Sequence, residues 1–169
     1  MKQKLLLLLC FFATTFGFSQ TFTDNGINYN VTSSTTVEVG DNTGFSGVAN
    51  IPATVTYNNQ SYAVTSIKYV AFQNCSGLTS IIIPNSVTSI GNNAFYSCTG
   101  LTSVTIPNLI TSIGFATFTG CSGLASITIP DSVTSIGDQA FNSCSGLTSV
   151  TIGNSVSSIG GNALPIVSD

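Results

Sequence analysis

The sequence contains no histidine, no arginine and no tryptophan, and charged residues make up only 5% of its 169 residues. Because no imidazole is present to act as a base, neither a Ser-His-Asp triad nor a Cys-His nucleophile can form. The commonest protein ligand of metal ions is missing for the same reason. We therefore do not expect an enzyme, and we predict no catalytic residue, no cofactor and no metal site.

Positive charge is also scarce, since Lys2, Lys4 and Lys68 are the only cations and the formal net charge is −3. A protein that binds nucleic acid needs lysines and arginines to neutralise phosphates, so we predict no nucleic-acid partner. Attachment to a membrane surface through a basic patch is excluded on the same ground. The six acidic residues do not recur at fixed positions along the chain, so no carboxylate pair or calcium array is indicated.

The first residues have the pattern of a secretory signal peptide. Two lysines are followed by the apolar run 5–12 and then by small residues that end at Ser19. The run is too short for a membrane anchor. We interpret residues 1–19 as a signal peptide and expect the mature chain to begin at Gln20. The prediction is a secreted or cell-surface protein with no membrane insertion after cleavage.

A 23-residue sequence motif repeats along most of the chain without a single insertion or deletion. Its four full copies begin at Val64, Val87, Ile110 and Val133, and a partial fifth copy begins at Val156. A fixed short period is typical of a solenoid, in which each coil buries its apolar face against its neighbours. The repeat therefore predicts the architecture before any single residue is considered.

Within each copy the apolar positions are constant. One segment reads L-x-x-V-x-I, as at Leu101, Val104 and Ile106, and a second reads V-T-S-I. We expect both segments to form short strands, and the A-F-x-x-C segment to point a phenylalanine inward. A proline, which cannot donate to a strand ladder, follows the first segment in three copies. A glycine precedes each leucine, and we expect it to take a positive φ at a corner of the coil: Gly77, Gly100, Gly123 and Gly146.

A repeat of the form L-x-x-I-x-I-P-x-S-V-T-S-I-G-x-x-A-F-x-x-C resembles the BspA-like leucine-rich repeat family of bacterial and protozoan surface proteins. The resemblance covers residues 64–163, or 51–169 if a degenerate first coil is counted. We predict a mostly β, right-handed leucine-rich-repeat solenoid of 23-residue repeats with an N-terminal β-hairpin cap. The resemblance also implies attachment or binding at a cell surface, and its motif carries no catalytic residue.

The domain organisation follows from where the repeat begins. Residues 64–169 hold the four full repeats and the partial one, and residues 20–63 are expected to form an N-terminal β cap and a degenerate first coil. Alternating segments predict one hairpin in residues 27–39 and another in residues 54–65. Terminal repeats of a solenoid must cover its core, so these hairpins are expected to close one end.

One cysteine stands at the same position in each full copy, and two interpretations are open. Secretion permits disulfides, and adjacent coils are close enough to be bridged. The alternative is a buried ladder of free thiols, each of which packs as a small hydrophobic group. We favour free thiols, because side chains in register point parallel to one another and the fifth copy has Val167 at this position. The cysteines are Cys75, Cys98, Cys121 and Cys144.

The outward positions of the L-x-x-V-x-I segments form columns of serine and threonine. A solenoid presents such regular surfaces to its partners, and we predict a binding face for an extracellular protein or glycan. A plainer interpretation is that serine and threonine simply keep exposed strands soluble. The predicted face consists of Ser80, Ser103, Thr105, Ser126, Thr128, Ser149 and Thr151.

Two function hypotheses therefore remain. The first is a binding or adhesion module that uses this face. The second is a structural or self-associating surface component without a specific ligand, since the last copy lacks its strand segment and leaves an apolar end uncovered. Self-association would then proceed through that C-terminal coil.

Overall fold

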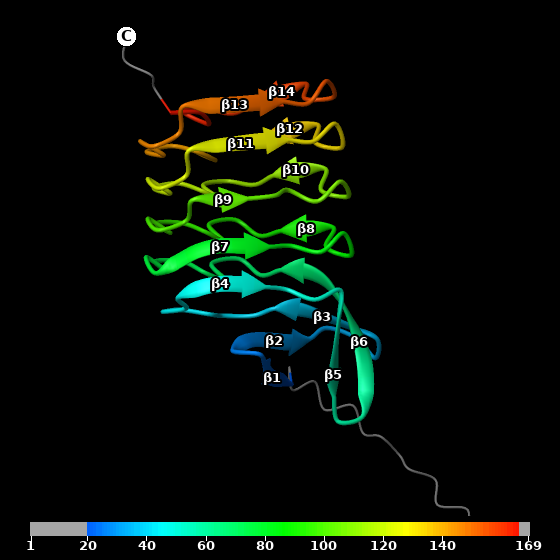
Figure 1. Cartoon of the computed structure of the whole chain (residues 1–169). Helices are drawn as coiled ribbons and strands as arrows, with labels where there is room; N and C mark the ends of the chain where they lie inside the picture. The colour runs from blue at the N-terminus through cyan, green and yellow to red at the C-terminus, as the bar shows by residue number, and fades with distance from the viewer. Residues whose placement is uncertain (1–19, 166–169) are drawn as a thin grey trace, which may run out of the picture.

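The computed structural model describes residues 20–165, which form a stack of β coils that rises from the N-terminal to the C-terminal side (Figure 1). The signal-peptide prediction for residues 1–19 lies outside this range, as do residues 166–169. No helix occurs within residues 20–165. In particular, this part of the chain has no helix of the length and apolarity needed to cross a membrane. The structure is thus the mostly β solenoid that the repeat predicts.

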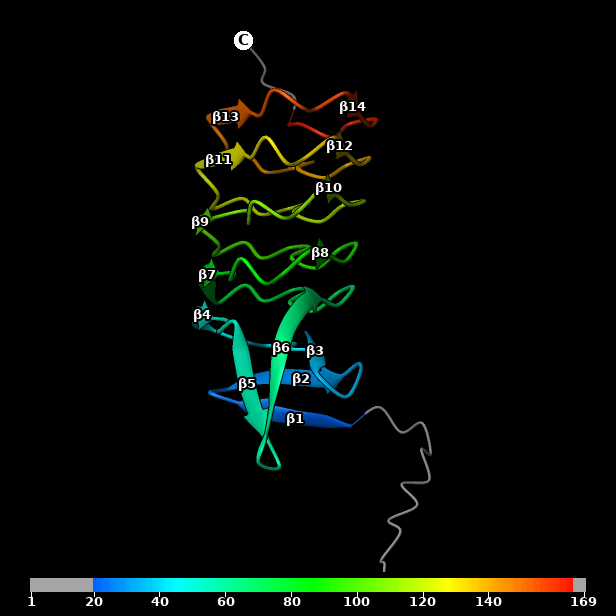
Figure 2. The same ribbon diagram turned by 90° about the vertical axis from the view of Figure 1, so that its right-hand side faces the viewer.

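Two columns of short strands run along the stack and are best separated in Figure 2. The L-x-x-V-x-I column contains β4 (Gly47–Asn50), β7 (Leu78–Ile82), β9 (Ser103–Val104), β11 (Ser126–Ile129) and β13 (Ser149–Ile152). The V-T-S-I column contains the last part of β6 (Gln60–Ile67), then β8 (Ser89–Ile90), β10 (Ser112–Ile113), β12 (Ser135–Ile136) and β14 (Ser158–Ile159). Paired strands are parallel and in register, so that Ser126 faces Ser149 and Ile113 faces Ile136. Each side chain therefore stands on its equivalent in the preceding coil.

The N-terminal end is closed by antiparallel strands. β1 (Thr21–Asp24), β2 (Ile27–Val31) and β3 (Thr36–Val39) form a meander, which includes the hairpin expected in residues 27–39. β5 (Thr54–Tyr57) and β6 form the second expected hairpin. It turns through Asn58 and Asn59, both of which have positive φ, as a two-residue hairpin loop requires. In Figure 1 this hairpin extends downward past β1 and β2.

A first coil precedes the recognisable repeats. β3 pairs in parallel with β6, with Val37 opposite Val64 and Val39 opposite Ile67, while β4 pairs in parallel with β7. β3 therefore belongs to the cap on one side and to the solenoid on the other. Phe45 of this coil contacts the ring of Phe72 edge-on at 5.9 Å between centroids.

A phenylalanine ladder runs through the middle of the stack. Phe72, Phe95, Phe118 and Phe141 are fully buried, and their rings stack with centroid distances of 5.6, 5.2 and 5.3 Å. The cysteine and the leucine of each full coil are buried around it. Burial of one large apolar side chain per coil is what holds each coil to the next.

The corner glycines do not have the backbone conformation that the sequence analysis assigned to them. None of the four that precede the leucines has a positive φ, so that prediction is wrong. They are required for a different reason, which is the close contact between coils. A Cβ added to Gly100 would lie 2.3 Å from the carbonyl oxygen of Ser76, and one added to Gly146 would lie 2.3 Å from that of Ser122.

Positive φ occurs instead in the A-F-x-x-C turn, mostly at residues other than glycine. One column stands immediately before the alanine position and the other immediately before the cysteine. The first contains Val70, Asn93, Ala116, Gln139 and Asn162, and the second contains Asn74, Ser97, Gly120 and Ser143. Each of the four full coils therefore has two left-handed residues, and Val70 is the only β-branched residue with positive φ within residues 20–165. A β-branched side chain is the least suited to this conformation.

We expect Val70→Asn to raise the free energy of unfolding by about 1 kcal/mol, because asparagine tolerates the left-handed region far better than valine. Asparagine already occupies this position in two other coils. The measurement is urea unfolding followed by circular dichroism. Val48→Asn is the control, since Val48 lies on an exposed strand without positive φ and should gain nothing. Equal effects of the two changes would contradict the explanation.

Phe118→Ala should destabilise the solenoid by about 3–5 kcal/mol, because it removes one ring from the buried ladder and leaves a cavity. Phe115 lies three positions earlier and is 45% exposed, so Phe115→Ala is a matched control with a loss of about 0.5 kcal/mol or less. Chemical denaturation of the two variants measures the difference. A loss below about 1 kcal/mol for Phe118→Ala would show that the ladder does not carry the stability.

Candidate functional site

The candidate site is the outer surface of the L-x-x-V-x-I strands, called here the strand face. Its first column runs Ser80, Ser103, Ser126 and Ser149, and its second runs Thr105, Thr128 and Thr151. Parallel pairing places Ser80 beside Ser103 and Thr128 beside Thr151. All seven predicted residues lie at the surface, and Ser80 alone is half-buried. The N-terminal end of the face is apolar, with Val48 and Ile82 more than half exposed.

The threonine hydroxyl groups of this face differ in their hydrogen bonding from other hydroxyl groups of the repeat, and also from the Ser103 hydroxyl, which donates to the Ser80 hydroxyl at 3.4 Å. The Thr102 hydroxyl donates to the Thr79 carbonyl at 3.0 Å, and the Thr148 hydroxyl donates to the Ala125 carbonyl at 3.2 Å, so the stacking itself occupies them. Thr105, Thr128 and Thr151 make no side-chain hydrogen bond to any part of residues 20–165. Their hydroxyl groups are therefore free to bind a ligand.

Two adjoining hollows lie at the C-terminal half of the strand face. The larger one has a volume of about 670 Å³ and is lined by Thr128 and Thr151 together with Pro130, Asp131 and Asn154. The smaller one measures about 310 Å³ and lies between β9 and β11. Of the seven predicted residues, these hollows bring together Ser103, Thr105, Ser126, Thr128 and Thr151. Ser80 and Ser149 line neither of them.

The smaller hollow coincides with an interruption of the strand ladder. β7 pairs with β9 and β11 pairs with β13, but β9 and β11 do not pair with each other. The Thr102 amide donates to Thr79 and the Thr148 amide donates to Ala125, whereas the Ala125 amide has no such bond to the coil before it. The face is thus divided into two ladders. The interruption is not visible in the repeat, which continues through it without a gap.

The larger hollow also involves the corner after the strand, which the sequence analysis did not include in the site. There the Asp131 carboxylate accepts a hydrogen bond from the backbone amide of Asn154 at 2.7 Å. Gly153 allows the two coils to approach, since a Cβ on it would lie 2.7 Å from the carbonyl carbon of Pro130. The sequence held two signals for this corner, which are the replacement of proline by glycine in the fourth copy and the aspartate at a position that is asparagine in the other full copies.

Comparison with known proteins identifies the repeat. The family profile described as "BspA type Leucine rich repeat region (6 copies)" matches residues 43–165. The chain belongs to this family. The match begins before the first full repeat and therefore includes β4 of the first coil. The resemblance inferred from the repeat is confirmed.

Solved structures of other BspA-type and leucine-rich repeat proteins agree with this fold. A leucine-rich repeat protein from Bacteroides ovatus is 36% identical, with a TM-score of 0.67 over 83% of this chain and 43% of its own. A leucine rich cell surface protein from Faecalibacterium prausnitzii is 31% identical, with a TM-score of 0.64 over 85% of this chain and 45% of its own. A leucine-rich repeat protein from Bacteroides capillosus is 30% identical, with a TM-score of 0.69 over 78% of this chain and 97% of its own. The chain thus spans less than half of the first two relatives. No curated protein matches it.

The four repeat cysteines of this BspA-type chain are free and buried, as favoured from the sequence. Each thiol donates a hydrogen bond to a carbonyl of the preceding coil, for example Cys121 to Phe95 at 3.1 Å and Cys144 to Phe118 at 3.0 Å. Burial raises the pKa of Cys75, and it raises the pKa of Cys144 to about 11. Within residues 20–165 no group of three or more cysteine or acidic side chains converges on a position that could hold a metal ion.

These thiols should not react with iodoacetamide at pH 8 in the folded protein. They are buried, and with a pKa of about 11 only roughly one Cys144 in a thousand is a thiolate at that pH. After unfolding without reductant, all four should be alkylated, as read from the masses of chymotryptic peptides. Glutathione in the same tube controls for reagent activity. Unmodified pairs in the unfolded chain would instead demonstrate disulfides.

Proposed function

We propose that this BspA-type protein is a secreted or cell-surface binding module that contacts an extracellular protein or glycan through its strand face. The observation that carries the proposal is the row of threonines whose hydroxyl groups are left free by the stacking and which border two hollows. The family fits a role in surface binding or adhesion. A relative from Faecalibacterium prausnitzii is described as a cell surface protein, which supports the proposed location. We propose no catalytic activity.

Self-association is the second candidate, and the last described coil favours it. Ile152 is 39% exposed and Ile159 is 49% exposed, whereas the equivalent Ile129 and Ile136 of the coil before are each 1% exposed. Within residues 20–165, β13 and β14 are the outermost strands of their ladders, so this part of the chain leaves one edge of each without a partner. Apolar side chains beside unpaired strand edges are a common route to association between chains.

The first test of the binding proposal is a panel of immobilised extracellular matrix proteins and glycans, probed with the purified chain. A triple variant with Thr105, Thr128 and Thr151 changed to Lys should lose at least about tenfold in affinity, because long charged side chains would cover the strand face and its hollows.

A second triple variant, with Ser89, Ser112 and Ser158 changed to Lys, is the matched control. These serines are exposed on the V-T-S-I strands, and the change adds the same charge. It should bind like the unmodified chain. Equal losses in both variants would place the site elsewhere or show a purely electrostatic effect. Concentration-dependent assembly in sedimentation velocity, with no hit in the panel, would favour self-association.

A further inference from the structure

The larger hollow contains a single charged group, the carboxylate of Asp131. One of its oxygens, Oδ1, accepts a hydrogen bond from the backbone amide of Asn154 at 2.7 Å. The other oxygen, Oδ2, has no hydrogen-bond partner within residues 20–165. The side chain is exposed, so this oxygen can accept a hydrogen bond from a ligand.

The contact that Asp131 makes between coils does not require a negative charge. At another corner of the coil, the side-chain oxygen of Asn92 accepts a hydrogen bond from the backbone amide of Phe115 at 3.0 Å. A neutral asparagine side chain can therefore make the same kind of contact between coils. The position of Asp131 is occupied by asparagine in the other full copies, at Asn85, Asn108 and Asn154. The charge of Asp131 is therefore an addition that the stacking does not explain.

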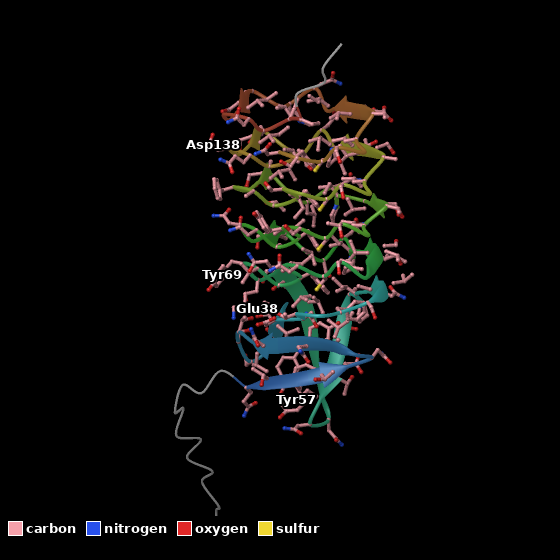
Figure 3. The ribbon with its side chains drawn as sticks, turned by 90° about the vertical axis from the view of Figure 1, so that its left-hand side faces the viewer. Glu38, Tyr57, Tyr69 and Asp138 are labelled. Atoms are coloured by element: carbon pink, nitrogen blue, oxygen red, sulfur yellow. The ribbon has the colours of Figure 1, made fainter. Side chains whose placement is uncertain are left out.

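No cation of the same solenoid segment neutralises this charge. Residues 69–165 contain neither lysine nor arginine, and Asp138 is their only other acidic residue. In Figure 3, Asp138 lies on the edge of the stack that also carries Tyr69 and Glu38, away from the strand face. A ligand with a positive group would thus find an unpaired carboxylate at the hollow and no competing lysine or arginine.

The walls of the hollow suit a long cationic side chain. Pro130 and Ile152 supply an apolar surface next to the carboxylate, and Ile152 is 39% exposed. Lysine and arginine combine an apolar stem with a charged head, and they place the stem on such surfaces while the head seeks an acceptor. Thr128 and Thr151 border the same hollow and can bond to the backbone of an extended segment.

We propose that this hollow binds a lysine or arginine side chain presented by an extended segment of a partner protein. The proposal rests on the proposed function of the strand face and specifies its ligand as protein rather than glycan. The ammonium or guanidinium group donates to Asp131 Oδ2, and the stem lies along Pro130 and Ile152. Because the site is open to solvent, the pairing adds a modest selectivity, roughly fivefold in affinity for a cationic over a neutral side chain.

The test uses three peptides, acetyl-Thr-Val-Xaa-Val-Thr-amide with Xaa as lysine, glutamine or glutamate, and maltohexaose as a glycan probe. Each is titrated at millimolar concentration into the ¹⁵N-labelled chain. The lysine peptide should shift the amides of Asp131, Ser132 and Asn154 and should bind roughly fivefold more tightly than the glutamine peptide. The glutamate peptide should bind most weakly.

Asp131→Asn should abolish the preference for lysine while it keeps the Asn154 contact. Asp138→Asn is the matched control, because Asp138 accepts the Gly161 amide at 2.8 Å in the same way but lies on the other edge. It should leave the preference intact. Unchanged amide spectra away from the substituted residues verify that both variants fold.

Several outcomes would overturn this inference. These are equal affinity for the lysine and glutamine peptides, a preference that survives in Asp131→Asn, shifts that cluster on another face, or binding of maltohexaose alone at these amides. If the panel of proteins and glycans still gives a hit that the threonine variant loses, the strand face binds but without a cation site. If the panel also fails, the proposed function fails with it.

Discussion

The structure depends on one constraint, which is that every coil must lie in register on the next at a spacing of about 5 Å. The stacked phenylalanine rings follow the same spacing, with centroids 5.2–5.6 Å apart. A coil of this size has too little apolar surface to be stable alone. Its leucine, phenylalanine and cysteine are buried only because an identical set lies above and below. An insertion within a strand segment would move its side chains out of register with both neighbours, whereas the β5–β6 hairpin extends away from the stack and leaves Ile67 in register with Ile90.

The same constraint explains features that look unfavourable in isolation. Left-handed residues in each turn are tolerated because their amide groups bond to the adjacent coil, as when the Val70 amide donates to the Asn92 carbonyl. The corner glycines leave no room for a Cβ against the preceding backbone. The buried cysteine thiols find acceptors in carbonyls of the preceding coil, such as that of Phe95, which also accepts the Cys98 backbone amide. Local strain is therefore offset by contacts between coils.

Stacking also divides the hydroxyl groups of the repeat into those that are bonded between coils and those that are free. Hydroxyl groups that point along the stack, such as those of Thr102 and Thr148, are bonded to the previous coil. Those that point outward from the strands, such as those of Thr128 and Thr151, are left free. The strand ladder is interrupted between β9 and β11, and this makes an otherwise regular face uneven. The proposed binding site thus lies where the repeat departs from regularity, at the gap and at the corner of Asp131 and Gly153.

The sequence by itself determined the solenoid, its period, the buried positions and the two cap hairpins, because periodic apolar residues and turn residues are local signals. It also indicated free thiols, since in-register side chains point parallel to one another. It predicted a degenerate first coil within residues 20–63, but it did not place the strands of that coil, β3 and β4, which pair in parallel with β6 and β7. It misassigned the corner glycines, because contact with another coil and a positive φ both select glycine. The hollows and the free carboxylate of Asp131 were decided by the tertiary structure alone. They depend on how residues 23 positions apart meet across the stack, and no single repeat contains that information.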